Sequence, residues 1–381
     1  MAKPRFYFYC YPWDLEDEGL EVSLGRLAGE IGVDGITVAA TTPEVYQFRP
    51  RKSGKYRVFR TEAGAHFQPD STFYTSTRIK PHPAVWMRSR NSLERIVKVC
   101  HKEKLKIRAS VCCCVGRATA KRYPFAACIN VLGVPSDRVL CPSNPEVKSY
   151  LCALVEDLTS NYGLESLELT DLRYLTFGDY DDREFCIPCR SDAAMELLAL
   201  CFCSSCRQAA IGDGLDAEHI EALVRKQIDT WLDVPDSNSQ TVNDLYSQSK
   251  QLPLLRVLQS KQLNELGALL KNHSQNHVSI GLRAPGYAYD RITTQVDKAC
   301  VNIEELSRLR SNAAYDPHRI SVAIPIQDSE YVEPRQLVST VHEASKTPFD
   351  SISFSSYGIA QQPTLDAIRQ AIRYAKRESI G

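Results

Sequence analysis

The sequence predicts an α/β protein folded as one (β/α)8 barrel, the TIM-barrel class, over residues 1–381. The first observation behind this prediction is a regular alternation of short apolar runs and amphipathic helical segments. The alternation is clear seven times and weaker an eighth time, as an eight-fold barrel requires. The second observation is that no Gly-X-Gly-X-X-Gly turn follows the first strand, which disfavours a doubly wound open sheet, the main alternative.

The predicted strands are short and mostly apolar, as buried parallel strands are. The run 300–302 gives the weakest strand signal. The eight predicted strands cover residues 6–11, 35–40, 105–111, 164–170, 278–283, 300–302, 320–326 and 351–355.

The helix before the fourth strand has the clearest boundaries. Asn144 is a favoured N-cap residue, Pro145 stands at the first helical position, and Gly163 ends the segment. Prolines also open the last two predicted helices, at Pro334 and Pro363. The other predicted helices cover residues 20–31, 92–101, 193–200, 217–232 and 254–272.

Two segments are too long to be ordinary connections. The segment 41–91 follows the second strand and is rich in proline, arginine and aromatic residues. Long loops on a rigid scaffold usually carry function or cover something. The segment 177–275 follows the fourth strand and combines the cysteine cluster with a helical insertion. We expect both to be extensions of the single barrel domain.

Composition restricts the choice of partners and compartment. Lysine plus arginine equals aspartate plus glutamate at 46 each, which argues against a dominant role in binding nucleic acid or an anionic membrane. No apolar run is long enough to span a membrane, and the N-terminus lacks the features of a secretory signal, so we expect a cytoplasmic protein. The sequence leaves open whether the chain forms a homo-oligomer.

We do not expect the 14 cysteines to form a disulfide framework in a reducing compartment. Three of them, Cys201, Cys203 and Cys206, lie within six residues at the start of a helix, a spacing typical of a zinc site. The fourth ligand has two candidate sources, Cys141 and the pair Cys186 and Cys189. The alternative is a set of reduced, buried cysteines without metal.

A family resemblance rests on the order of these motifs. Leu140-Cys141-Pro142 precedes a helix, a strand that ends in acidic residues, and then Cys201-Phe202-Cys203-X-X-Cys206. Over residues 138–210 this order resembles the zinc-cluster β-galactosidases of glycoside hydrolase family 42. The resemblance implies one structural zinc on the barrel, with Cys141, Cys201, Cys203 and Cys206 as its ligands. It also implies an acid/base residue at the end of the fourth strand, where the family has Asn-Glu and this chain has Thr170-Asp171.

Glycoside hydrolysis usually needs two carboxyl groups, which a barrel presents at the C-terminal ends of its strands. On the fourth strand Glu168 lies between two leucines, so it would point into the barrel if the leucines face the helices. Asp171 follows at the rim, where Arg173 is a candidate ion partner or substrate contact. At the end of the seventh strand, Asp328 is the candidate second carboxylate. The alternative for Asp328 is a residue in a solvated loop.

Further residues at strand ends are candidate substrate contacts. Asp14 and the aromatic residues Tyr11, Trp13, Tyr287 and Tyr357 would contact a sugar, although ordinary rim packing is the alternative for each aromatic ring. Arg283 would bind a substrate carboxylate or phosphate, or else pair with a barrel acid. Six basic residues of the long second loop form either a solvated surface or a site for an anionic sugar or polymer. They are Arg49, Arg51, Lys52, Lys55, Arg57 and Arg60.

The sequence therefore favours a glycoside hydrolase-like enzyme that acts on a carbohydrate, with Asp171 or Glu168 as acid/base, Asp328 as partner and a structural zinc. One alternative is a sugar-acid lyase or isomerase that uses Arg283. Another is a catalytically silent barrel that binds saccharide or a protein partner.

Overall fold

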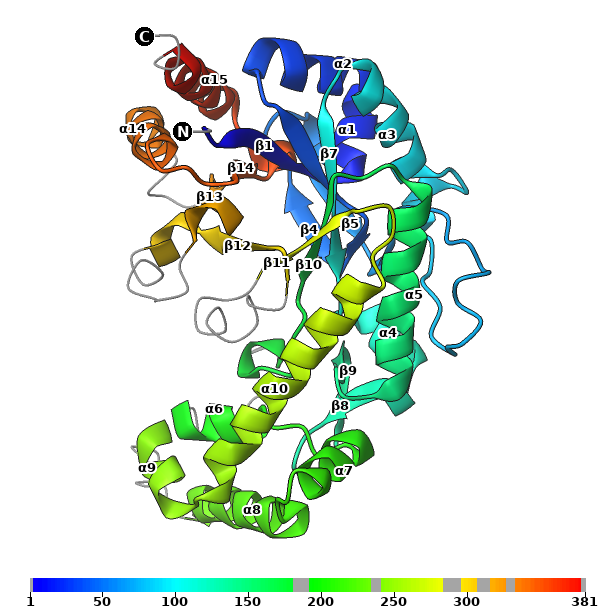
Figure 1. Ribbon diagram of the computed structural model, residues 1–381, viewed down its shortest axis with the longest axis vertical. Coiled ribbons are helices and arrows are strands. Elements are labelled where there is room, and N and C mark those ends of the chain that lie inside the picture. Colours follow the sequence, from blue (N-terminus) through cyan, green and yellow to red (C-terminus); the bar gives the residue numbers. More distant parts are fainter. Residues whose placement is uncertain are drawn as a thin grey trace.

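The computed structural model describes residues 3–180, 192–233, 241–283, 296–306, 316–326 and 333–377. Eight parallel strands form a closed barrel in the order β1-β14-β13-β12-β11-β10-β7-β2 (Figure 1). The predicted (β/α)8 barrel is thereby confirmed, including its weakest strand at 300–302. The barrel strands are β1 (Arg5–Cys10), β2 (Gly35–Ala39), β7 (Lys106–Cys112), β10 (Ser166–Thr170), β11 (Ser279–Arg283), β12 (Lys298–Asn302), β13 (Ile320–Pro325) and β14 (Ser351–Ser355).

Most barrel strands alternate between an outer apolar face and an inner, more polar face. In β14, Ile352 and Phe354 are buried in the core beneath the helices, and Ser351, Ser353 and Ser355 alternate with them. The alternation follows from the two-residue period of a strand. The helices that cover the barrel are α2 (Leu20–Gly25) with the π-helix η1 (Arg26–Ile31), α3 (Ser92–Lys102), α5 (Pro145–Asn161), α14 (Pro334–Ser345) and α15 (Gln362–Arg377).

The N-terminal end of the barrel is closed by a charged network. Asp350 accepts from Arg5 Nη2 at 3.1 Å and Arg108 Nη2 at 3.0 Å, and pairs with Lys298 Nζ at 2.9 Å. Burial alone would raise the pKa of Asp350, but the adjacent cations Arg108 and Lys298 hold it at about 2. This end is filled, which leaves the C-terminal end for a ligand.

A helical lobe extends from the barrel between β10 and β11 (Figure 1). It contains α6 (Asp192–Leu198), α7 (Ser204–Gly212), α8 (Ala217–Asp233) and α9 (Val242–Gln248), which share a hydrophobic core separate from that of the barrel. The long helix α10 (Gln251–Asn272) joins the two cores: Leu252 and Leu258 lie in the core of the lobe, and Leu266 and Leu270 in that of the barrel.

The segment after β2 forms its own small structure on the barrel. The paired strands β4 (Val45–Phe48) and β5 (Val58–Thr61) make a hairpin, and β3 (Thr41–Thr42) pairs with β6 (Gly64–Ala65). No helix in the described ranges is long and apolar enough to cross a membrane. Other elements used below are α1 (Pro12–Glu18), α4 (Arg117–Arg122), β8 (Ala127–Ile129), β9 (Pro135–Leu140) and η10 (Tyr357–Ile359).

Candidate functional site

The strand β10 brings two carboxylates toward the C-terminal end of the barrel. Leu167 and Leu169 are buried in the outer core, so Glu168 lies on the inner face of the strand. There its Oε1 accepts a hydrogen bond from Arg283 Nε at 2.7 Å. Arg283 is the last residue of β11, and its charge is therefore met by a barrel acid, one of the two roles that the sequence left open.

Asp171 lies one residue beyond β10 and is the more accessible of the two carboxylates. Its side chain is 34% exposed, against 11% for Glu168. The backbone of Asp171 is left-handed at φ 51°, a conformation that aspartate tolerates better than most residues. Arg173 Nε donates to Asp171 Oδ1 at 3.1 Å and also forms a two-pronged ion pair with Asp179. The predicted partnership of Asp171 and Arg173 is thus present.

A neutral thiol also contacts Asp171. Cys112 Sγ lies 3.5 Å from Asp171 Oδ2 and 3.2 Å from the carbonyl oxygen of Val115. Burial and the nearby Asp171 carboxylate raise the pKa of Cys112 well above its ordinary value. The thiol therefore remains protonated and donates to its oxygen neighbours, which disfavours Cys112 as a nucleophile.

A row of aromatic rings runs from the barrel interior to the hairpin. Tyr9 on β1 contacts Tyr11 edge to face, and Tyr11 stacks on Trp13 with ring centroids 4.5 Å apart. Trp13 also stacks on Phe59 of β5 at 4.6 Å and donates from Nε1 to Gln47 Oε1 at 2.6 Å. With 1% of its surface exposed, Trp13 has no face open to a sugar, in contrast to its predicted role. Tyr9, Tyr11 and Phe59, the other rings of this row, are partly exposed.

Two other predicted substrate contacts are buried. The Asp14 side chain is enclosed, with Gln47 Nε2 donating to its Oδ2 at 3.0 Å and no hydrogen bond to its Oδ1. Burial raises the pKa of Asp14 to about 7. Tyr357 is also fully buried; its hydroxyl donates to Glu18 Oε2 at 2.6 Å, and Arg51 covers its ring at 4.4 Å. Packing at the rim, and not substrate contact, is what the structure shows for Asp14 and Tyr357.

Four predicted residues cannot be placed in this geometry. Asp328, Tyr287, Cys186 and Cys189 lie outside the described residues.

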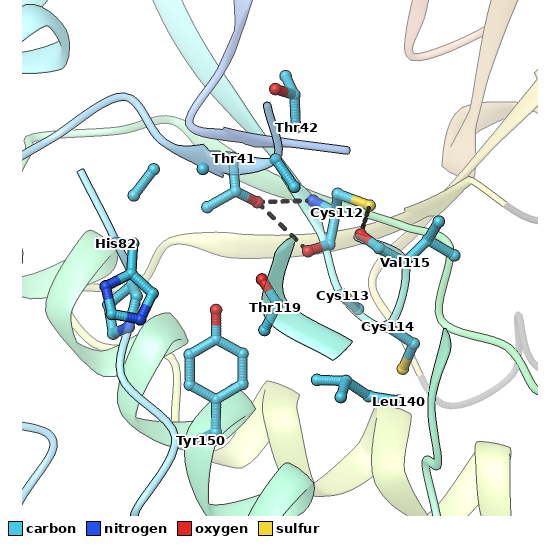
Figure 2. A pocket seen from close by; sticks show the side chains of 14 residues that line it. Thr41, Thr42, His82, Cys112, Cys113, Cys114, Val115, Thr119, Leu140 and Tyr150 are labelled. Atoms are coloured by element: carbon cyan, nitrogen blue, oxygen red, sulfur yellow. Dashed lines mark hydrogen bonds between the residues drawn. The ribbon is translucent and has the colours of Figure 1, made fainter. Parts of the chain in front are cut away.

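A partly open hollow of about 410 Å³ lies beside the end of β7, under the segment after β2 (Figure 2). Thr41 Oγ1 accepts from the Cys112 backbone nitrogen at 2.8 Å and closes one side of the hollow. The hydroxyl of Tyr150 points into it from α5, toward Thr119 and His82 (Figure 2). Within the described part of the chain, no Asp, Glu, Lys or Arg side chain lines the hollow. His82 is neutral there, because burial and the nearby Arg122 lower its pKa.

The cysteine cluster has the geometry of a tetrahedral metal site. Cys141, Cys201, Cys203 and Cys206 are buried, and their sulfur atoms all lie within 4.8 Å of one another. Cys141 Sγ is 3.5 Å from Cys203 and Cys206 and 3.9 Å from Cys201. Four sulfurs at about 2.3 Å from zinc would stand about 3.8 Å apart. The separations fit that tetrahedron and are far too long for disulfides.

The fold explains how these four cysteines meet. Cys141 follows β9, Cys203 caps α7, and Cys206 lies in the first turn of that helix. A fifth cysteine, Cys128 of β8, lies against Cys141 and Cys201 and was not singled out from the sequence. Its position inside an apolar stretch gives no signal of its proximity to the cluster.

Sequence reasoning also missed Tyr9 and Gln47. The alternation of Arg5, Tyr7 and Tyr9 with Phe6 and Phe8 would have placed Tyr9 on the inner face of β1. No comparable signal identifies Gln47, because its contacts with Trp13 and Asp14 depend on how the hairpin folds back.

No protein-family model matches the chain, and a search of curated proteins gives no match. Its structure is similar to α-L-fucosidase isoenzyme 2 from Paenibacillus thiaminolyticus, with a TM-score of 0.56 at 11% identity, covering 100% of this chain and 50% of that one. It is similar to the glycoside hydrolase domain of PgaB (BpsB) from Bordetella bronchiseptica, with a TM-score of 0.53 at 11% identity over 97% of this chain and 98% of that domain. A β-galactosidase from the psychrophilic Marinomonas ef1 gives a TM-score of 0.52 at 12% identity, covering 99% of this chain and 60% of that one.

The chain thus spans half of the fucosidase and three-fifths of the β-galactosidase. At these identities the likeness shows the fold alone: a barrel of the kind found in glycoside hydrolases. It does not confirm family 42 in particular.

Proposed function

We propose that the chain is a glycoside hydrolase that acts on a carbohydrate through paired carboxylates at the C-terminal end of its barrel. The observation that supports this most strongly is Asp171, an accessible carboxylate in a left-handed backbone conformation directly after β10. Active sites of (β/α)8 enzymes are built at this end of the barrel.

The contacts of each carboxylate suggest its role. Asp171 is ion-paired with Arg173, a contact that suits a nucleophile or base better than a proton donor. The proton donor would then be Asp328, which follows β13 in the sequence. Glu168 is held by Arg283 inside the barrel, so we assign it a positioning role.

Arg283 also bears on the alternative of a sugar-acid lyase or isomerase. That alternative needs a free guanidinium for the substrate's carboxylate. Because Arg283 donates to Glu168, its geometry favours the hydrolase. Tyr11, a partly exposed ring of the aromatic row, is the ring that would contact a sugar.

The proposal includes a structural zinc held by Cys141, Cys201, Cys203 and Cys206. When bound, the ion would supply a cross-link and no chemistry, because four thiolates leave no open coordination position. The cross-link would tie the start of α5 to α7 and so hold the helical lobe on the barrel. All twelve cysteines in the described ranges are free, which supports a reducing compartment such as the cytoplasm.

The test is hydrolysis of 4-nitrophenyl glycosides of the common hexoses, fucose, N-acetylhexosamines and hexuronic acids, in both anomeric forms. We expect the wild type to release nitrophenol from at least one of them. Asp171→Asn should lower kcat/KM by about 10²–10⁴-fold, the usual contribution of a catalytic carboxylate. Asp213→Asn, at an exposed residue directly after α7 in the lobe, is the control. Equal activity in Asp171→Asn and wild type would rule out the assigned role. Turnover of none of the glycosides would favour the silent barrel.

A further inference from the structure

The hairpin of β4 and β5 has two chemically different faces. Tyr46 pairs with Arg60 across the two strands, and Phe48 pairs with Val58. These four residues are exposed, Tyr46 at 77% and Phe48 at 58%. Aromatic rings this exposed are unusual on a surface that has no partner. We call the residues Tyr46, Phe48, Lys55, Tyr56, Arg57, Val58 and Arg60 the outer face.

The inner face fixes the hairpin to the barrel. Gln47 accepts a hydrogen bond from Trp13 Nε1 at 2.6 Å and donates one to Asp14 Oδ2 at 3.0 Å. Phe59 stacks on Trp13. The loop after β4 is anchored in the same way, because Arg49 pairs with Asp17 and Arg51 with Glu18. The outer face is therefore carried on a rigid element that is continuous with the aromatic row at the barrel mouth.

The outer face has an excess of positive charge. Residues 45–61 contain six basic residues and no acidic residue. Two of the six, Arg49 and Arg51, are neutralised inward. Lys55, Arg57 and Arg60 are exposed, and none of the three forms an ion pair with a described residue. A chain whose net charge is zero thus has a local cationic surface with aromatic rings in it.

We propose that the outer face docks a polysaccharide whose sugars carry carboxylates, a polyuronate. Tyr46 and Phe48 stand two residues apart on one strand, so their rings lie roughly 6.5–7 Å apart along it. They offer successive apolar platforms to a sugar chain, and the planar guanidinium groups of Arg57 and Arg60 match carboxylates in a two-pronged geometry. The inference rests on the proposed function and names the substrate class for that site.

The same chemistry argues against nucleic acid and anionic membrane as the occupant. Phosphate backbones are bound by extended basic stripes on proteins with a marked positive charge. Here three cations, one on β5 and two in the turn between the strands, lie among aromatic rings of a short hairpin, and the chain as a whole is neutral. Double-stranded DNA and phosphatidylserine vesicles therefore serve as the competing probes.

The experiment is affinity electrophoresis of the full chain in native gels containing alginate, with dextran gels as the uncharged reference. We expect alginate to retard the wild type, and we expect this retardation to decrease as the salt concentration is raised. Tyr46→Ser/Phe48→Ser and Arg57→Gln/Arg60→Gln should each weaken the apparent Kd at least tenfold. Because these side chains are exposed, thermal unfolding should show that both variants are folded.

Matched controls lie on α15. Tyr374→Ser removes an exposed ring, and Arg373→Gln/Arg377→Gln removes two exposed charges, and both should bind alginate as the wild type does. Asp171→Asn should also bind normally, which separates docking from catalysis. The proposal would be overturned if alginate did not retard the wild type, or if it retarded the hairpin variants as much as the wild type. Tighter binding of the wild type to DNA or to the vesicles than to alginate would also overturn it.

Discussion

The carboxyl group of Asp14 occupies the space where a side chain at Gly358 would stand. A β-carbon at Gly358 would overlap with Oδ2 and Cγ of Asp14. The contact joins the start of α1, after β1, to η10, after β14, and so fixes two neighbouring loops at the barrel rim.

This contact predicts that Gly358→Ala destabilises the protein. Neither Asp14 nor the backbone of η10 can move far in a buried site, so the overlap should cost about 1–3 kcal/mol or more. Urea denaturation followed by circular dichroism measures the change. Gly212→Ala, where a β-carbon meets nothing within 4 Å, should have little effect. Equal stability of Gly358→Ala and wild type would contradict the contact.

Asp14 should also make the folded state sensitive to pH. Burial raises its pKa from 3.8 to about 7, so the folded state holds this proton more tightly than the unfolded chain. The contribution is fully favourable below pH 4 and is lost as pH rises through 7, up to about 4 kcal/mol in total.

Asp14→Asn removes that dependence. We expect the variant to gain stability relative to wild type between pH 5 and pH 8 in denaturation curves. Taking the difference between the two proteins cancels groups such as His66, whose pKa burial lowers to about 3. A difference that does not change with pH would show that Asp14 is already ionised at pH 5.

The ion pair of Glu168 and Arg283 should behave as a unit. Arg283→Met would leave Glu168 charged inside the barrel, and the loss of one partner of such a pair costs about 3–5 kcal/mol when both are buried. Since the Arg283 side chain is 27% exposed, we expect the lower end of that range. Glu168→Gln/Arg283→Met should recover much of the loss. A double-mutant cycle by chemical denaturation would contradict the pairing if the two changes were additive.

The cysteine cluster predicts about one zinc per chain. Metal analysis of Cys203→Ser should show that the zinc is lost, and this variant should have a lower Tm than the wild type. Treatment with EDTA should also lower the Tm of the wild type. Cys152→Ser, a buried cysteine of α5 away from the cluster, should keep its metal. If the wild type contained no metal and had the same Tm as Cys203→Ser, the metal site would be contradicted, and the cluster would be four packed thiols.

Much of the fold could be predicted because its signals are local. Apolar runs of strand length, Asn144 and Pro145 at the start of α5, and the spacing of Cys201, Cys203 and Cys206 are all set by near neighbours in the chain. The strand β12 was the weakest prediction because only Ala299, Cys300 and Val301 form its buried part.

Only the tertiary structure decided which strand-end residues are accessible. Trp13, Asp14 and Tyr357 have the residue types of a sugar site, yet they are covered by Phe59, Gly358 and Arg51, which are distant in the sequence. The choice of Cys141 over other cysteines, and of Glu168 as partner of Arg283, likewise depends on barrel closure. Periodicity records which face of an element is buried, whereas the atoms that meet on that face are determined by packing between segments far apart in the chain.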